Sequence, residues 1–427
     1  MATRTLTHEA QLGLNKLIDD ACADRTAGLP YASAVLVGRG PAALFQHSSN
    51  TAVAARQQQG PEESPGTDDI LWLASCTKLV TTIACLQLVE QDRLSLDDSS
   101  QVEAMCPELM NAMVLKEDGS LVPKIRGITL RMLLTHTAGF GYSFLNDKLN
   151  KYKSSQMGRQ PKHYDEFSGS LEDILQPLVN QPGEKFEYGV LERVTRMNLN
   201  DYMQKHIFQP LNIHDLSMIP SPLMRSRLVG LWQRNIDGSL SPREYLLSRA
   251  LHTENFGECN HSGGAGLFGS IRQFSKVLTA LLTGGTSPET GSSILSPASV
   301  SQMFTNQLPQ WPNFARRHLP AAKPELVYPA EGLYPVCPPS FPQGFGLGCL
   351  ISPGITGRSE GAVHWTGLSN VFWWVDQENG IGGVVASQVL PFVDPQAATL
   401  WLQIEARAYE GLQKTNGKYG QDALRCP

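Results

Sequence analysis

The stretch ILWLASCTKLVTTIACLQLVEQD, residues 70–92, decides the fold that this sequence predicts. It begins as an apolar run, turns at Ser75 and continues as a helix that is apolar on most of its faces. A helix of this kind is normally buried. We therefore expect it to lie near the centre of the molecule, with other elements packed around it.

Ser75 and Lys78 lie three residues apart in the first turn of this helix, so their side chains project from one face. The free amide hydrogens of a first turn favour an alkoxide, and a lysine pushed toward neutrality by burial can take part in proton transfer. Ser75 is therefore the candidate nucleophile. The alternative is a serine that caps the helix and a lysine that reaches solvent. Because a Ser-x-x-Lys tetrad arises by chance roughly once or twice in such a chain, partners elsewhere must decide.

The composition predicts a globular protein with a small-molecule partner. Hydrophobic residues make up 41% of the 427, and the net charge of -5 is spread without long runs of one sign. That distribution argues against nucleic acid or an anionic membrane as the main partner. The spacing of the eight cysteines and ten histidines indicates no metal, cofactor or disulfide framework. The first twenty residues lack a signal-peptide core, so we expect a cytoplasmic location.

The two ends of the chain predict a single sheet. Residues 8–24 have the spacing of an amphipathic helix, and two strand-like runs follow it at 34–37 and 42–45. Further strands and a closing helix are indicated at 345–351, 362–365, 371–375, 381–387 and 395–412. We expect an α/β (α+β) fold in which a sheet built from both ends is flanked by helices, beside a mostly helical subdomain.

The same pattern predicts one domain over residues 1–427. Its expected parts are a sheet subdomain of about 1–70 and 343–413, a helical subdomain of about 71–300, a proline-rich loop at 307–342 and a tail at 414–427. The proline-rich loop also carries aromatic residues, so it is either the wall of a pocket or a surface insertion without function. Residues 143–170 are polar, and we expect them to run over the surface.

Three other candidates compete for a chemical role. Gly264–Gly269 matches Gly-x-Gly-x-x-Gly, but the preceding residues are polar and no parallel βαβ pattern surrounds it, so a nucleotide site is disfavoured. Ser359 lies in a Gly-x-Ser-x-Gly match between two strands, where a nucleophile elbow needs a strand and then a helix. His136 is either a general base or, as its place at a helix end favours, a structural residue.

Three blocks of the sequence resemble the serine β-lactamase and penicillin-binding-protein superfamily. They are Ser75-Cys76-Thr77-Lys78, Tyr188-Gly189-Val190 and His364-Trp365-Thr366-Gly367. The linking segments extend the likeness over most of residues 10–410. Within the superfamily the chain is similar to the family VIII esterases and, closer still, to the lovastatin acyltransferase group, which acylates polyketide alcohols. The resemblance implies a β-lactamase/transpeptidase-like fold with an antiparallel sheet.

The resemblance also implies roles for individual residues. Ser75 becomes the acylated nucleophile, Lys78 and Tyr188 share the proton relay, and the backbone amides of Ser75 and Leu368 form the oxyanion hole. A phenolate beside a protonated lysine is a plausible base, although a tyrosine here can equally be packed in the core. Substrate contacts, for which core packing is an equal alternative, are implied for Trp72, Tyr142, His364, Trp365, Thr366 and Gly367.

Two departures from the superfamily bear on function. Val190 stands where the lactamase-like relatives carry Asn, which disfavours a peptide or β-lactam substrate. The relatives also have a longer segment between this tyrosine and the part that matches Glu192–Thr195, so the helix that supports Tyr188 is shortened here. A displaced base lowers the rate steeply, about a hundredfold for 1 Å.

Three functions follow from these observations. The leading hypothesis is an acyltransferase that moves an acyl group from a thioester, on coenzyme A or an acyl carrier domain of a polyketide synthase, to an alcohol of a secondary metabolite. The second is a serine esterase of small esters, which shares the acyl-Ser75 intermediate and uses water as the acceptor. The third, a non-catalytic member that binds a metabolite or partner protein, is motivated by the shortened segment after Tyr188.

Overall fold

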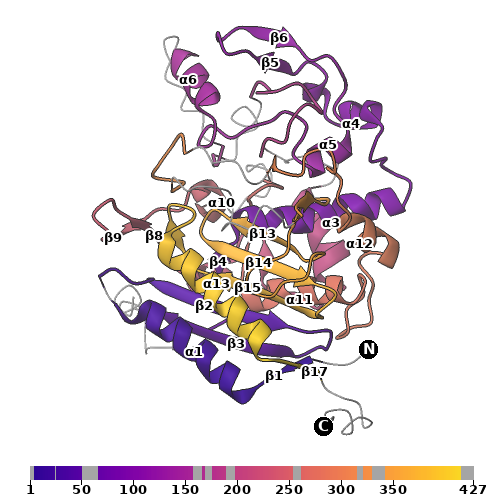
Figure 1. Cartoon of the computed structure of the whole chain (residues 1–427). Helices are drawn as coiled ribbons and strands as arrows, with labels where there is room; N and C mark the ends of the chain where they lie inside the picture. The colour runs from indigo at the N-terminus through magenta and orange to yellow at the C-terminus, as the bar shows by residue number, and fades with distance from the viewer. Residues whose placement is uncertain are drawn as a thin grey trace, which may run out of the picture.

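A seven-stranded antiparallel sheet lies at the centre of the fold (Figure 1). The computed structural model describes residues 4–24, 26–50, 66–156, 166–168, 176–188, 198–252, 261–314, 321–328 and 342–414. Along the sheet the strand order is β11 (Gly344–Phe345), β12 (Leu350–Ile351), β13 (Val363–Gly367), β14 (Val371–Asp376), β15 (Ile381–Ala386), β2 (Tyr31–Val37) and β3 (Ala43–Asn50). The pairing of β15 with β2 joins the two ends of the chain, which confirms the predicted fold class.

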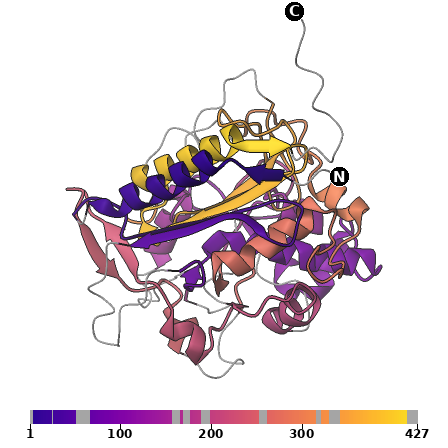
Figure 2. The ribbon, with the colours of Figure 1, turned by 90° about the horizontal axis from the view of Figure 1, so that it is seen from below.

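Two terminal helices cover one face of this sheet. α1 (His8–Ala23) and α13 (Pro395–Glu410) lie side by side on that face, as Figure 2 shows. α1 buries Ala10, Leu14, Ile18 and Cys22, one residue per turn, and its N-terminus is capped by Thr7, whose Oγ1 accepts from the amide of Ala10 at 3.1 Å. Next to these helices, β1 (Arg4–Leu6) pairs with β17 (Leu412–Lys414).

The opposite face of the sheet packs on the predicted central helix and its neighbour. α3 (Thr77–Glu90) is buried at every residue from Thr77 to Leu88, and α11 (Ile271–Leu282) contacts β14, β15 and β2. A helix that is apolar on most of its faces has to be enclosed in this way, because an exposed face would leave apolar surface in water. The expectation of a central helix after Ser75 is confirmed.

Short elements complete the chain around this core. Three small sheets contain β4 (Leu71–Trp72), β10 (Phe268–Gly269) and β7 (Leu216–Ser217); β16 (Val389–Leu390), β8 (Leu231–Arg234) and β9 (Leu240–Arg243); and β5 (Met113–Leu115) with β6 (Leu121–Pro123). The remaining α-helices are α4 (Ser99–Met105), α5 (Leu130–Leu134), α6 (Asp147–Gln156), α8 (Leu199–Met203), α9 (Pro222–Ser226), α10 (Ser248–His252) and α12 (Pro297–Met303). In the described part of the chain, no helix has the length and apolar character needed to cross a membrane.

One segment differs from its expected place. We expect the polar stretch 143–170 on the surface, yet Ser143, Phe144, Leu145 and Phe167 are buried. Positions 157–165, 169 and 170 lie outside the described residues. Glu166 explains part of this burial, because its carboxylate accepts from the amide of Ser143 at 2.7 Å and from the Ser143 hydroxyl at 3.0 Å. A buried, hydrogen-bonded carboxylate can hold a polar segment against the core.

Candidate active site

Ser75 lies in a 3₁₀ turn, Ala74–Cys76, between β4 and α3. Ala74 has a φ of +46°, which an L-residue with a Cβ rarely adopts, so the chain turns sharply just before Ser75. Ala74 and Cys76 are fully buried, whereas Ser75 is only partly buried. The turn therefore leaves the serine more exposed than either neighbour.

Lys78 holds its side-chain nitrogen beside the Ser75 hydroxyl. The lysine is 1% exposed, and Nζ lies 3.3 Å from Ser75 Oγ, 3.1 Å from Tyr142 Oη and 2.8 Å from the carbonyl oxygen of Gly264. An amine nitrogen has three positions for contacts, as three hydrogens or as two hydrogens and a lone pair, and these three contacts use all of them. Lys78 therefore does not extend to solvent, which removes the alternative of an ordinary surface lysine.

Tyr188 reaches Lys78 with its ring and not with its hydroxyl. Lys78 Nζ lies 4.8 Å from the centre of the Tyr188 ring, within range for a cation–π contact. The Tyr188 hydroxyl is buried without a hydrogen-bond partner among the described residues. The phenol that contacts Lys78 through oxygen is Tyr142, which the sequence indicated only as a substrate contact. Val190 and the shortened segment after Tyr188 lie outside the described residues.

His136 forms part of an aromatic cluster behind this pair. Its ring stacks on Trp365 at 6.0 Å and meets the ring of Tyr188 at 4.7 Å, with Phe186 and Phe345 at its other edges. The residue is 5% exposed and has a φ of +55°. This placement favours the structural role expected for a histidine at a helix end, where it supports the rings that face Ser75.

The backbone amides of Ser75 and Leu368 lie on two segments that pack tightly against each other. A Cβ added at Gly367, the residue before Leu368, would lie 2.5 Å from the carbonyl oxygen of Leu73, so β13 approaches the serine turn as closely as glycine allows. Among the described residues, neither amide donates a hydrogen bond. Two free N–H groups close to a candidate nucleophile are what an oxyanion hole requires. Gly367, predicted as a substrate contact, packs closely on the backbone of the serine turn.

An apolar pocket opens over Ser75. It encloses about 530 Å³ of space not filled by protein atoms, solvent at its mouth included. Of the predicted residues, Ser75, Tyr142, Tyr188, Trp365, Thr366 and Leu368 line it. Sequence reasoning missed the other lining residues, which are Ala74, Phe144, Leu145, Phe167, Ala265, Val327 and Phe392. The available signal was the presence of Phe144 and Phe167 within the polar stretch 143–170.

Part of the proline-rich loop does form a wall of this pocket. Val327 pairs with Phe392 through a β-bridge, in which the amide of Tyr328 donates to the Phe392 carbonyl at 2.9 Å and the amide of Phe392 donates to the Leu326 carbonyl at 2.8 Å. This described portion of the loop favours the pocket-wall alternative over a free surface insertion.

Two predicted substrate contacts lie elsewhere. His364 is fully buried on the face of the sheet that carries α13, with its ring 6.1 Å from that of Trp401 and its Nε2 2.9 Å from Ser352 Oγ. Since side chains alternate along β13, His364 and Trp365 point to opposite faces. Burial and the nearby charge of Arg358 hold the pKa of His364 well below its usual range.

Trp72 lies behind the pocket wall, not in it. The residue is fully buried, its indole nitrogen donates to the Ala265 carbonyl at 2.7 Å, and its ring meets Phe167 edge-on at 5.8 Å. Its expected contact with substrate is therefore replaced by support of Ala265 and Phe167, which do line the pocket.

The two competing motifs have structural roles. Gly264 accepts the hydrogen bond from Lys78, and Leu267 pairs with the serine turn through the bond from the Leu73 amide to its carbonyl, 2.9 Å long. The glycine-rich segment thus encloses the lysine. Ser359 donates to Asp376 through its hydroxyl at 2.8 Å and its amide at 2.9 Å.

Comparison with known proteins identifies the family. The β-lactamase family model matches residues 32–407. The chain belongs to the β-lactamase family. This membership, together with the antiparallel sheet and central helix, confirms the superfamily that the three sequence blocks resembled.

Individual members of the family include both transferases and an esterase. The chain is 34% identical over 367 residues to the lovastatin esterase of Penicillium rubens, covering 81% of this chain and 86% of that protein. It is 31% identical over 363 residues to the monacolin J acid methylbutanoyltransferase of Aspergillus terreus, covering 80% and 82%. A LovD6 variant of simvastatin synthase from Aspergillus terreus superimposes with a TM-score of 0.76 at 27% identity, covering 94% of this chain and 95% of that one.

Proposed function

We propose that this protein is a serine acyltransferase that carries an acyl group on Ser75 and passes it to an alcohol. The observation that carries the proposal is the position of Lys78 Nζ, 3.3 Å from the Ser75 hydroxyl in a buried site at an apolar pocket. A serine hydroxyl needs such a neighbour to react at neutral pH. The transferase relatives support the choice of reaction.

The first half-reaction loads the enzyme. Ser75 Oγ forms a bond to the acyl carbon of a thioester while its proton passes to Lys78 Nζ in the neutral amine form. The amides of Ser75 and Leu368 hold the oxygen that becomes negative, a contribution of about 3 kcal/mol for each donor. The carbon–sulfur bond then breaks, and the thiol leaves with the proton returned from Lys78.

The second half-reaction unloads it. The hydroxyl oxygen of the acceptor attacks the ester carbon, and the hydroxyl proton passes to Lys78. Lys78 then returns a proton to Ser75 Oγ as the bond from this oxygen to the acyl group breaks. Tyr142 fixes Lys78 by accepting from it at 3.1 Å. Tyr188 shares the proton relay. Its buried hydroxyl without a described partner supports this role, since a polar group left in that state is costly and is expected to gain a partner in the loaded enzyme.

The pocket supports an apolar acyl group and an uncharged acceptor. Apart from the hydroxyls of Ser75, Tyr142, Tyr188 and Thr366 and the indole N–H of Trp365, the side chains of its lining residues are apolar. Such a lining stabilises an alkyl chain by roughly 0.8 kcal/mol for each buried CH₂. We propose as donor a thioester on coenzyme A or on an acyl carrier domain of a polyketide synthase, and as acceptor an alcohol of a secondary metabolite such as a polyketide.

An esterase is the second candidate, favoured by the 34% identity to the lovastatin esterase. Both reactions pass through the same acyl-Ser75, and they differ in whether water or an alcohol attacks it. The third hypothesis, a non-catalytic member, is weakened by the buried Lys78 beside Ser75, because an unused buried amine would be costly to keep.

The experiment that separates these functions follows a short acyl thioester with and without an added alcohol. A transferase forms more ester than free acid as the alcohol concentration rises, and total turnover increases with it. An esterase releases free acid at a rate that the alcohol does not change. A chain that consumes no thioester beyond the Ser75→Ala control, while both remain folded, is not an enzyme of this class.

A further inference from the structure

The turn between β13 and β14 carries the amide of Leu368, so its position decides whether an oxyanion hole exists. Two contacts hold the turn against the serine segment. Ser369 Oγ donates to the Trp72 carbonyl at 2.7 Å, and Gly367 packs on the carbonyl of Leu73. A third attachment comes from the other side, through Asn370.

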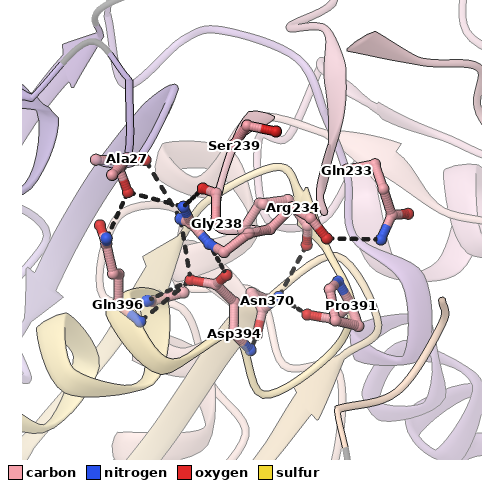
Figure 3. A network of polar contacts seen from close by, with 12 residues as sticks. Ala27, Gln233, Arg234, Gly238, Ser239, Asn370, Pro391, Asp394 and Gln396 are labelled. Carbon is pink, nitrogen blue, oxygen red and sulfur yellow. Dashed lines mark hydrogen bonds and ion pairs between the residues drawn. The ribbon is translucent and has the colours of Figure 1, made fainter. Parts of the chain in front are cut away.

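Asn370 is buried, and both the nitrogen and the oxygen of its side-chain amide form hydrogen bonds. It is 1% exposed and has a φ of +59°, and its Nδ2 donates to the carbonyls of Val389 at 2.8 Å and Pro391 at 2.9 Å (Figure 3). Its Oδ1 accepts from the amide of Asp394 at 3.3 Å. One asparagine therefore joins the turn to the whole segment 389–394.

A buried ion pair holds that segment in turn. The Asp394 carboxylate is fully buried, pairs with the Arg234 guanidinium and accepts from the amides of Gln396 and Ala397 at the start of α13 (Figure 3). Arg234 also donates to the Ala27 carbonyl at 2.7 Å. Because a buried charge pair with satisfied partners is geometrically restrictive, Asp394 has little freedom to move.

The held segment also forms part of the substrate pocket. Phe392 lies between Pro391 and Asp394, lines the pocket and pairs with the Val327 segment of the proline-rich loop. Asn370 thus connects the turn that carries the Leu368 amide with the segment that carries Phe392, and both residues line the pocket.

We propose that Asn370 is a positioning residue for acyl transfer, which rests on the function proposed above. Its side chain fixes the Leu368 amide relative to both Ser75 and Phe392, so that the oxygen of the tetrahedral intermediate and the acyl chain are held in one geometry. No contact with substrate is required. A displacement of about 1 Å at such a donor costs about a hundredfold in rate.

Two variants test this role. Asn370→Gly keeps the left-handed backbone accessible and removes only the side-chain attachment. Asn370→Asp keeps the shape but sets a carboxylate oxygen against the carbonyls of Val389 and Pro391. We expect kcat for a short acyl thioester to fall by about 10- to 100-fold in both variants. KM should change less than threefold, because the apolar lining remains.

The control is Glu405→Gln, which weakens another buried ion pair. In the wild type, Glu405 pairs with Arg358 at 2.8 Å, and this pair ties α13 to the chain after β12. It should lower the melting temperature and leave kcat within about twofold at a temperature where all proteins are folded. The proposal is overturned if kcat of a folded Asn370 variant matches that of Glu405→Gln. If Asn370→Asp does not fold, Asn370→Gly decides alone. An inactive wild type, in contrast, would contradict the proposed function itself.

Discussion

Two serines of this chain match hydrolase motifs, and their surroundings differ in every respect that matters for catalysis. Ser75 has a lysine nitrogen at 3.3 Å, an amide that is free among the described residues, and a pocket. Ser359 gives both its hydroxyl and its amide to the carboxylate of Asp376, which Tyr409 also contacts at 2.9 Å. The first serine can meet a substrate, and the second is committed to its own fold.

The base available to each serine explains the difference further. Burial raises the pKa of Asp376, but hydrogen bonds from Asn379 and Ser359 outweigh it and leave the pKa below its ordinary value. A carboxylate of low pKa is a poor acceptor for a serine proton. The group beside a serine, and not the motif around it, therefore makes a nucleophile.

The largest effect is expected from removing the amine of Lys78, the proposed base. Lys78→Met keeps the length of the side chain and removes the amine, so kcat/KM for a short thioester should fall by about 10³- to 10⁴-fold. The measurement is steady-state turnover of the folded variant. The matched control is Lys124→Met, which removes the mostly buried partner of Glu103 at 2.7 Å in the helical part and should leave kcat/KM within about twofold. Equal losses in the two variants would contradict a role for Lys78 at Ser75.

The next effect comes from the oxyanion donor. Gly367→Ala places a Cβ 2.5 Å from the Leu73 carbonyl, which forces β13 away from the serine turn. We expect kcat to fall by about 10²- to 10³-fold, the usual cost of losing one donor. In the control, Gly361→Ala, an added Cβ meets no described atom within 4 Å, and turnover should stay unchanged. Full activity in Gly367→Ala would show that Leu368 is not a donor.

The two phenols should separate stability from activity. Tyr142→Phe removes the oxygen that Lys78 contacts, so both the melting temperature and kcat should fall, kcat by about tenfold. Tyr188→Phe removes a buried hydroxyl without a described partner, so the protein should be equally or more stable while kcat falls at least tenfold. Thermal melting and turnover of both variants check this. Unchanged turnover in Tyr188→Phe would remove Tyr188 from the relay.

These contrasts show what the sequence could and could not predict. Apolar spacing predicted α1, α3 and the strands of the main sheet, because each pattern reports local burial. The contact of Tyr142 with Lys78 was missed, since the two residues lie 64 positions apart and only tertiary packing joins them. Phe144 and Phe167 were missed because their polar neighbours concealed a buried segment held by Glu166.

The substrate contacts show a second limit. His364 and Trp365 are adjacent in one block, yet the alternation of a strand sends them to opposite faces. A sequence block such as residues 364–367 therefore predicts a strand beside the site, but it does not predict which side chains of that strand face Ser75.

The smallest effect should appear as pH-dependent stability on the face away from Ser75. The folded chain keeps His364 neutral because burial and Arg358 lower its pKa, whereas the unfolded chain protonates it below about pH 6.5. Stability should therefore decline as the pH falls below that value, by at most about 1.4 kcal/mol per pH unit. Urea unfolding at pH 7.5 and pH 5.5 measures it, and His364→Asn should have a flatter profile. If the wild type and His364→Asn lost the same stability between pH 7.5 and pH 5.5, a neutral, buried His364 would be contradicted.

The most direct test of the central claim locates the acyl group on the protein. The wild type, Ser75→Ala and Ser359→Ala are each mixed with a short acyl thioester and quenched in acid. The mass of each intact protein is measured by mass spectrometry, and a digest is then used for peptide mapping. We predict one acyl group in the wild type and in Ser359→Ala, on the peptide that contains Ser75, and none in Ser75→Ala. An acyl group that persists in Ser75→Ala, or one found on the Ser359 peptide, would contradict the account.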